Sequence, residues 1–316
     1  MPNVISSDHT PLGPGREFDV IRELLQHWGA RARGIGDDAA VLDVPPGQHL
    51  VVSTDTSIEG VHFRSGWLTP REIGWRATTA ALSDLAAMGA SPLGMVLALV
   101  LPPAFLPHVG ELSDGIGEAA AAAGTPIVGG DTSRGDTLGV GVTVMGSAAA
   151  PVRRGGARAG DHVYVTGHLG GPGAALKAWE QGRVPLSEHR ERFAHPRARI
   201  AEGQWLAAAG ASAMIDVSDG LAADLRHLAS ASVASFEIDL SLVPAVVGVD
   251  QADAALSGEE YELVVTSPAP IDVLAFRACF DLSLTRIGSV TAGDVPALRC
   301  VRDGVVVDLG SGYEHF

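Results

Sequence analysis

Apolar residues in the first half of the chain switch repeatedly between helical and strand spacing. Residues 18–28 carry apolar side chains three and four positions apart, which predicts an amphipathic helix. Apolar runs at 50–55, 96–100 and 138–146 predict strands, and the run at 126–128 leads into the sequence GGD. An Ala-rich segment at 112–123 predicts another helix. This alternation indicates an α/β protein.

One helix has clear start and stop signals. Thr69 is followed by Pro70 and then by Glu72, which is typical of an N-terminal capping box, and Gly89 is placed to end the helix. Asp84 then lies inside this helix, on the same face as several Ala residues. A lone carboxylate on such a face is costly to bury, so it needs an Arg, a backbone donor or a cation as its partner. Pairing with an Arg and binding of a cation both remain open at this point.

The second half repeats the mixture of elements. Residues 162–167 predict a strand that enters a Gly-rich turn at 168–173, followed by a helix from Ala174. The stretch 213–221 predicts a strand leading to a helix with three Leu on one face, and 257–267 and 284–290 predict further strands. A chain of 316 residues exceeds the usual size of one core. We expect two domains, with a boundary near 148–151, where the composition becomes small and then basic.

The composition limits the classes of partner that the protein can bind. The net charge of -15 argues against nucleic acid, and only one of the 22 basic residues, Lys177, is a lysine. A phosphate-binding loop of the G-x-x-x-x-G-K-[ST] type is therefore excluded. Residues 85–110 lack charged side chains but contain several Pro and Gly, so we expect no membrane span. Two cysteines and the lack of a secretory signal predict a cytoplasmic protein.

Acidic residues recur beside the predicted strands. Asp38, Asp55, Asp131 and Asp216 each adjoin a short apolar run, where α/β folds place ligand-binding loops. Any one of them is more simply a turn former or a helix cap. As a group, with the oxygen atoms of a predicted turn at 53–55, they favour a hard cation such as Mg²⁺ held together with nucleotide phosphates.

Other candidate residues each have an ordinary structural explanation as well. The Gly-rich turn could offer N–H groups to an anion or could be a plain tight turn. Arg153 and Arg154 could clamp phosphate or belong to a solvated linker. His62 could touch a substrate or face a core, and Tyr313 could stack on a ring or fix the C-terminus. There is no G-x-S-x-G or Cys-His signature for covalent catalysis.

Taken in order along the chain, eight motifs resemble the thiamine-monophosphate kinase family. They are GIGDDAAVL, STDTSIEGVHF, ALSDLAAMGASP, GGDTSRG, RRGGARAGD, IDVSDGLAADL, SGEEYEL and the terminal GYEHF. The resemblance implies a two-domain α/β fold similar to that of aminoimidazole ribonucleotide synthetase. It also implies a homodimer in which the N-terminal domains of both subunits form a β-barrel. We expect a disordered tail at 1–16, an N-terminal domain at 17–149 and a C-terminal domain at 150–316.

The same resemblance implies an activity and a set of site residues. The activity is ATP-dependent phosphorylation of thiamine monophosphate to thiamine diphosphate with several Mg²⁺ ions, and with no covalent nucleophile or general base. The metal ligands would be Asp38, Ser53, Thr54, Asp55, Asp84, Asp131, Asp216 and Asp219. Asp37 would be a neighbour rather than a ligand. ATP would contact Gly130, Asp131, Arg154 and Ser218, and thiamine monophosphate would contact His62, Glu259 and Tyr313.

Two segments depart from the usual family pattern. The family stretch GGEDYEL is SGEEYEL here, so Ser257 replaces a Gly and Glu260 replaces an Asp. The Gly-rich turn reads GHLGGPG, where the family more often has an Asp followed by Ser. Alternative functions are another ATP-dependent enzyme related to aminoimidazole ribonucleotide synthetase, or a non-catalytic protein that binds nucleotide and metal. Selenophosphate synthetase and hydrogenase-maturation relatives need a reactive Cys near one terminus, and the first Cys here is Cys279.

Overall fold

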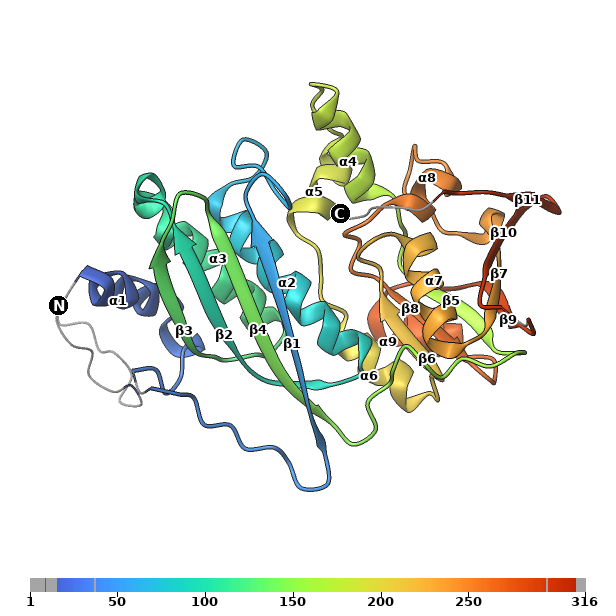
Figure 1. The fold of residues 1–316 in the computed structure, drawn as a ribbon, viewed down its shortest axis with the longest axis horizontal. Coiled ribbons are helices and arrows are strands. Elements are labelled where there is room, and N and C mark those ends of the chain that lie inside the picture. The colour runs from blue at the N-terminus through green and yellow to red at the C-terminus, as the bar shows by residue number, and fades with distance from the viewer. Residues whose placement is uncertain (1–8, 10–15, 37, 294, 311–316) are drawn as a thin grey trace. The chain divides into compact units, whose positions relative to one another are not determined.

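The computed structural model describes residues 9, 16–36, 38–293 and 295–310 (Figure 1). It divides into two compact units, and each is described by itself. The first unit comprises the described residues up to Leu85 together with Ser91–Ala149. The second comprises Ala86–Ala90 and the described residues from Ala150 onward. Apart from residues 9 and 16, the tail expected at 1–16 lies outside the described residues.

A four-stranded sheet with the order β1-β4-β2-β3 forms the centre of the first unit. Strand β4 pairs antiparallel with both of its neighbours, and β2 pairs parallel with β3. Helices lie against one face of this sheet and leave the other open (Figure 1). The elements are α1 (Arg16–Trp28), η1 (Gly29–Arg31), β1 (His49–Ile58), α2 (Pro70–Ala87), β2 (Ser91–Leu101), η2 (Pro103–His108), α3 (Val109–Ala122), β3 (Ile127–Arg134) and β4 (Gly139–Ala148).

Local signals in the sequence set where α2 begins. The capping box is formed, because the Thr69 N–H donates to Glu72 Oε2 at 2.8 Å and the Glu72 N–H donates to Thr69 Oγ1 at 3.3 Å. Helices α2 and α3 approach closely at glycines. A Cβ added at Gly115 would lie 1.9 Å from the carbonyl oxygen of Arg71, and one at Gly74 would lie 2.2 Å from that of Leu112. Glycine is therefore required at this crossing.

The open face of the first sheet carries exposed apolar side chains. In β1 the side chains alternate between partly buried and exposed positions, as expected for a sheet covered on one face only. Leu50 and Val52 are 53% and 55% exposed, and Val100 of β2 is 38% exposed. These three residues mark a face that the described residues of the first unit leave uncovered.

A seven-stranded sheet with the order β11-β10-β7-β9-β5-β8-β6 forms the second unit. Strand β5 shows that both faces are covered. Val163 and Val165 pack in a core with Leu225 of α7, and Tyr164 between them packs in a second core with Phe276 of α9. The strands are β5 (His162–Thr166), β6 (Ala213–Asp216), β7 (Ser235–Asp239), β8 (Leu263–Ser267), β9 (Leu284–Thr291), β10 (Leu298–Arg302) and β11 (Val305–Val307). The helices are α4 (Gly171–Glu180), α5 (Ser187–Ala194), α6 (Ile200–Ala208), α7 (Leu221–Ser232), η3 (Leu240–Leu242), α8 (Gln251–Leu256) and α9 (Val273–Phe280).

Two details differ from the sequence predictions. The strand predicted at 257–267 begins only at Leu263, because Glu259 and Tyr261 have positive φ angles of 60° and 53° and interrupt extended backbone. The predicted turn at 53–55 is instead the middle of β1, which β4 pairs along its whole length. Within the described part of the chain, no helix combines the length and apolar character needed to cross a membrane.

Candidate functional site

Strand β1 carries three of the predicted metal ligands, and the alternation of its side chains decides which of them share a face. Side chains alternate along a strand, so Ser53 and Asp55 point to the face covered by α2 and Thr54 points to the open face. Ser53 Oγ donates to Asp84 Oδ2 at 2.5 Å, which joins β1 to α2. Thr54 Oγ1 instead lies 3.0 Å from Thr143 Oγ1 of β4. The Thr54 side chain therefore does not share a face with Ser53 and Asp55.

One partner of Asp84 is a side-chain hydroxyl. Its carboxylate is half-buried in α2 and accepts the Ser53 hydroxyl. The signal for this contact is tertiary, since Ser53 and Asp84 are 31 positions apart.

Asp131 is also in a strand rather than in the loop that the sequence predicted. The register aligns Asp55, Val142, Leu97 and Gly130 across the sheet, and Asp131 belongs to the next row with Ala98. Adjacent rows face opposite sides, so Asp131 lies on the open face and Asp55 on the helix-covered face. Gly130 packs closely, because a Cβ there would lie 2.6 Å from the Leu97 carbonyl oxygen.

The remaining candidates of the first unit lie in irregular segments. Asp38 is exposed, and its neighbour Asp37 lies outside the described residues. His62 follows β1 in a turn, and its Nδ1 accepts the N–H of Ile58 at 3.1 Å. Nδ1 is therefore the unprotonated nitrogen in this contact, and the imidazole is held by the end of β1.

Acidic residues crowd the loop between β6 and α7 in the second unit. Asp216 ends β6 and is 3% exposed, and Asp224 in the first turn of α7 is 1% exposed. Asp224 Oδ2 accepts the backbone N–H groups of Ser218 and Asp219 at 3.1 and 3.2 Å. Burial, together with the charges of Asp216 and Asp219, raises the pKa of Asp224 to about 8. Asp224 thus holds the loop that carries the predicted ligands.

The donor set in this loop suits a hard cation. Asp219, Asp224 and His227 each place one possible ligand atom within 4.8 Å of the others. His227 Nε2 is 4.0 Å from Asp219 Oδ2, but its side chain is 54% exposed and imidazole is not the oxygen donor that Mg²⁺ prefers. The carboxylates of Asp216 and Asp219 are such donors. Asp224 was not predicted from the sequence, although an acid in the first turn of a helix after a DG turn was a usable signal.

The segment that carries Glu259 is tied to this acidic loop through its backbone. The N–H of Glu259 donates to the Ser218 carbonyl at 2.6 Å, and the N–H of Tyr261 donates to that of Val217 at 2.9 Å. Gly258 allows this approach, because a Cβ there would lie 2.7 Å from the Ser218 carbonyl oxygen. Glu259 therefore lies beside the loop of Ser218 and Asp219.

Arg154 and Tyr313 are the remaining residues predicted to contact ATP or substrate. Arg154 is exposed, as is Arg153, and the backbone carbonyl of Arg154 accepts the Ser232 hydroxyl at 2.9 Å. That bond fixes the backbone and leaves the guanidinium in solvent. Tyr313 lies outside the described residues.

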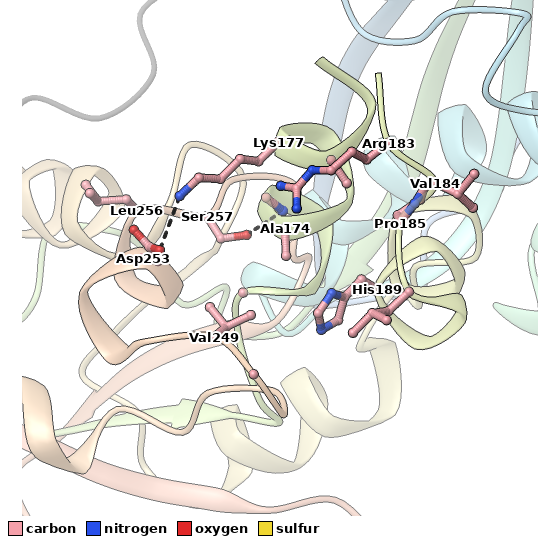
Figure 2. A pocket seen from close by; sticks show the side chains of 15 residues that line it. Ala174, Lys177, Arg183, Val184, Pro185, His189, Val249, Asp253, Leu256 and Ser257 are labelled. Atoms are coloured by element: carbon pink, nitrogen blue, oxygen red, sulfur yellow. Dashed lines mark hydrogen bonds and ion pairs between the residues drawn. The ribbon is translucent and has the colours of Figure 1, made fainter. Parts of the chain in front are cut away.

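A cavity of about 520 Å³ lies in the second unit, apart from the predicted site residues (Figure 2). Lys177 lines it and is 3.5 Å from Asp253, which also lines it. Ser257, Gly170 and Gly173 line another part. The rest of the lining is mainly apolar and includes Val184, Pro185, Leu186, Val249 and Leu256.

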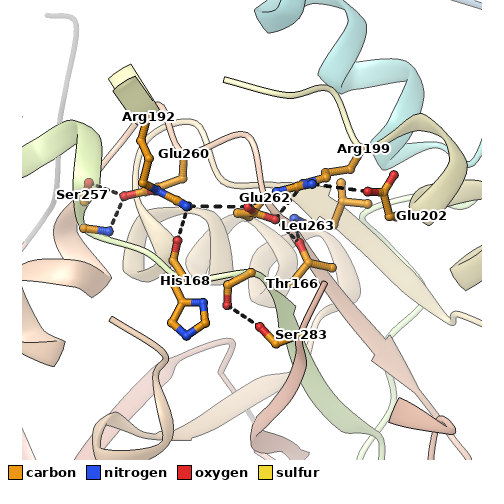
Figure 3. A network of polar contacts seen from close by, with 12 residues as sticks. Thr166, His168, Arg192, Arg199, Glu202, Ser257, Glu260, Glu262, Leu263 and Ser283 are labelled. Atoms are coloured by element: carbon orange, nitrogen blue, oxygen red, sulfur yellow. Dashed lines mark hydrogen bonds and ion pairs between the residues drawn. The ribbon is translucent and has the colours of Figure 1, made fainter. Parts of the chain in front are cut away.

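Buried charges form a network beside this cavity (Figure 3). Glu262, whose side chain is 2% exposed, accepts hydrogen bonds from Arg199 Nε at 3.0 Å and from Thr166 Oγ1 at 2.6 Å. Arg192 Nη2 lies 3.6 Å from both Glu262 Oε1 and Glu260 Oε2. Burial lowers the pKa of Arg199, but attraction to Glu262 and the hydrogen bonds that Arg199 donates to it outweigh burial and keep the pKa raised. This network was not predicted from the sequence, because its members are dispersed from 166 to 262.

Each of the two units matches a known family of domains. Residues 36–148 match the model of the AIR synthase related protein N-terminal domain, and residues 158–301 match that of the C-terminal domain. The chain is thus an AIR synthase related protein with both domains of that class.

Similarity to individual relatives identifies the family within this class. The chain is 39% identical over 309 residues to thiamine-monophosphate kinase of Escherichia coli O157:H7, covering 90% of this chain and 91% of the relative. The crystal structure of thiamine-monophosphate kinase from Stenotrophomonas maltophilia K279a is 36% identical, with a TM-score of 0.80 over 90% of this chain and 97% of that one. A structure described as AaThiL complexed with AMPPCP and TMP is 29% identical, with a TM-score of 0.75 over 95% of this chain and 96% of that one. The chain belongs to the thiamine-monophosphate kinase family.

Proposed function

We propose that this protein transfers the terminal phosphoryl group of ATP to thiamine monophosphate, in line and without a covalent enzyme intermediate, to give thiamine diphosphate. One observation carries the proposal: the chain shares its fold, over 95% of its length, with a family member described as complexed with AMPPCP and TMP. Both units carry carboxylates of the kind that the reaction needs. Asp55 and Asp84 lie near Ser53 in the first, and Asp216 and Asp219 lie in one loop of the second.

The oxygen-rich donor set fits Mg²⁺. We propose that Asp38, Ser53, Thr54, Asp55, Asp84, Asp131, Asp216 and Asp219 hold several ions, with Thr54 contributing its backbone carbonyl because its side chain points to the opposite face from Ser53. Bound Mg²⁺ would neutralise the phosphate charges of donor and acceptor. The chain's own task is to keep the carboxylates fixed, and the Ser53–Asp84 and Asp224–Ser218 hydrogen bonds do so.

Binding and orientation account for the other residues. We propose that Gly130, Asp131, Arg154 and Ser218 contact ATP, and that His62, Glu259 and Tyr313 contact thiamine monophosphate. The guanidinium of Arg154 is exposed, and its planar group of donors suits a phosphate. The acceptor is a phosphate monoester that is already largely ionised near pH 7, so no strong general base is required.

We also propose a homodimer, in which the open faces of two first-unit sheets close into a barrel. The exposed Leu50, Val52 and Val100 on that face support it, because apolar patches of this kind are usually covered by a partner. Following the division after Ala149, we assign 17–149 and 150–316 as the two domains. The free cysteines Cys279 and Cys300 support a cytoplasmic location.

A coupled assay tests the function. Purified protein with ATP, thiamine monophosphate and Mg²⁺ should release ADP and form thiamine diphosphate in equal amounts. ADP release without thiamine diphosphate would instead favour another ATP-dependent enzyme of this class. Binding of ATP with no turnover would favour a non-catalytic nucleotide-binding protein.

A further inference from the structure

The two segments that depart from the usual family sequence meet in the second unit. Ser257 and Glu260 belong to SGEEYEL, and Gly170 and Gly173 belong to the Gly-rich turn, about 90 positions earlier in the chain. We propose that Ser257 and Glu260 are positioning residues that clasp the Gly-rich turn and thereby fix the orientation of Glu259 toward thiamine monophosphate. The inference rests on the proposed function for its substrate.

Glu260 makes the first half of the clasp. Its Oε1 accepts the Gly170 N–H at 2.5 Å and the Ser257 hydroxyl at 2.5 Å, and its side chain is completely buried. Among the described residues, Oε2 has no hydrogen-bond donor, and it faces Arg192 Nη2 at 3.6 Å. A buried carboxylate with so few donors is costly, so its retention needs a reason beyond stability.

Ser257 makes the second half. Its Oγ donates to Glu260 and accepts the Gly173 N–H at 2.9 Å, so one hydroxyl links both segments. The N–H groups of Gly170 and Gly173 are thus occupied by protein oxygens, and they are not free to bind an anion. Ser257 also lines the 520 Å³ cavity, which gives solvent a route to this side of the clasp.

The glycines of the turn are required by the clasp. Gly170 has a φ angle of 105°, which disfavours any other residue. A Cβ at Gly173 would lie 2.8 Å from Ser257 Oγ, and one at Gly171 would lie 2.6 Å from Arg192 Cδ. Ser257 and Arg192 therefore occupy the space that side chains in the turn would need.

The clasp acts on Glu259 because the segment is held from both sides. On one side, Glu259 and Tyr261 donate their N–H groups to the loop of Ser218. On the other side, Ser257 and Glu260 hold the Gly-rich turn. Glu259 sits between these attachments with a φ angle of 60°, a conformation that L residues adopt only when their surroundings impose it.

Charges from several elements face Glu260. Arg192 of α5 is 3.6 Å away, the charge of Glu262 also acts on Glu260, and Arg199 pairs with Glu262 at 2.5 Å. Burial outweighs the Ser257 and Gly170 donors and Arg192, and raises the pKa of Glu260 to about 7. Because burial disfavours the ionised form, the clasp is more stable while Glu260 is protonated, and it loosens as the pH rises through 7.

Kinetics of four variants test the proposal. Glu260→Ala and Ser257→Ala should raise KM for thiamine monophosphate about tenfold, with kcat and KM for ATP within about twofold of the wild type. Glu260→Gln should restore most of the affinity at pH 8, because its amide oxygen can still accept from Gly170. Glu202→Gln is the matched control, since Glu202 belongs to the same network through Arg199 but does not touch the turn.

The pH profile separates positioning from a merely structural role. In the wild type, KM for thiamine monophosphate should rise as the pH rises through 7, and the ratio of wild-type to Glu260→Gln values should contain that inflection. The substrate's own ionisation cancels in this ratio. Unchanged KM in both Ala variants, or a flat ratio from pH 6 to 8, would overturn the proposal.

Hydrogen exchange tests the clasp without a measurement of turnover. In Glu260→Ala, a peptide covering 168–176 should exchange at least about tenfold faster than in the wild type, because the Gly170 N–H loses its acceptor. Exchange of the same peptide in Glu202→Gln should be unchanged. If wild-type protein makes no thiamine diphosphate, the proposed function fails, whereas unaltered exchange in Glu260→Ala refutes the clasp itself.

Discussion

Replacing Gly115 by Ala should destabilise the first unit, although Ala is the better helix former. Gly115 lies in α3 at its crossing with α2, and the added Cβ would be 1.9 Å from the carbonyl oxygen of Arg71. Real contacts of this kind are longer than about 3 Å, so the two helix backbones must separate by about 1 Å. A backbone oxygen cannot rotate away as a side chain can.

Two opposing magnitudes decide the sign. The change from Gly to Ala inside a helix gains about 1 kcal/mol. Overpacking a tight interior costs about 1–3 kcal/mol, and a clash between backbones belongs at the upper end. The net loss is therefore about 2 kcal/mol, or roughly 5 °C in Tm for a unit of this size.

The same displacement should reach the site through α2. Asp84 lies in this helix and accepts the Ser53 hydroxyl at 2.5 Å, so a shift of about 1 Å would loosen that contact. Misplacement on this scale can reduce turnover up to about a hundredfold.

Thermal unfolding monitored by circular dichroism, with the coupled assay in parallel, measures both effects. Gly117→Ala is the matched control in the same helix, because its Cβ would meet only side-chain atoms, Trp28 Cδ1 at 3.1 Å and Arg31 Cδ at 3.2 Å. That variant should unfold within about 2 °C of the wild type. If Gly115→Ala were as stable as Gly117→Ala, the argument from backbone contact would be wrong.

Three more predictions concern the charged groups. Asp55→Asn and Asp131→Asn should each abolish thiamine diphosphate formation while leaving the unfolding transition cooperative, and normal turnover in either would remove that residue from the metal set. Adding Mg²⁺ at about 100 times its Kd should raise the free energy of unfolding by about 2.7 kcal/mol, and a chelator should reverse this; equal Tm values would argue against a bound cation. Folding raises the pKa of Glu260 from 4.5 to about 7, so the folded protein holds the proton more tightly than the unfolded chain does. The resulting contribution to the free energy of unfolding is complete below pH 4.5 and is lost as the pH rises to 7. Wild-type protein should therefore lose up to about 3 kcal/mol more than Glu260→Gln between pH 4.5 and 8 in denaturant titrations, and parallel curves would contradict the burial argument.

Several elements could be predicted because their signals are local. The helix at 70–87 begins at its capping box, and the three Leu of α7 are buried as their spacing predicts. The ordered motifs also pointed to the family, since the residues of each motif are neighbours in sequence. The fold class followed from the alternation of short apolar runs.

Other features depend on contacts that sequence spacing does not encode. Ser53 and Asp55 could be recognised as candidate ligands, but a predicted turn could not reveal that strand alternation points Thr54 away from them. One partner of Asp84 is a hydroxyl 31 positions earlier. Asp131 was expected in a loop, and only the register of β2 and β3 assigns it to the open face.

The sequence by itself determined the class of fold, the family and the residue types of the site, because helix caps, apolar periodicity and short motifs act over a few positions. The tertiary structure decided which of those residues share a face and which segments hold them. Glu260 illustrates the difference, since its letter in SGEEYEL carries no sign that its carboxylate meets the Gly170 N–H across 90 residues. Packing brings the two together, and burial then raises the pKa of Glu260 to about 7.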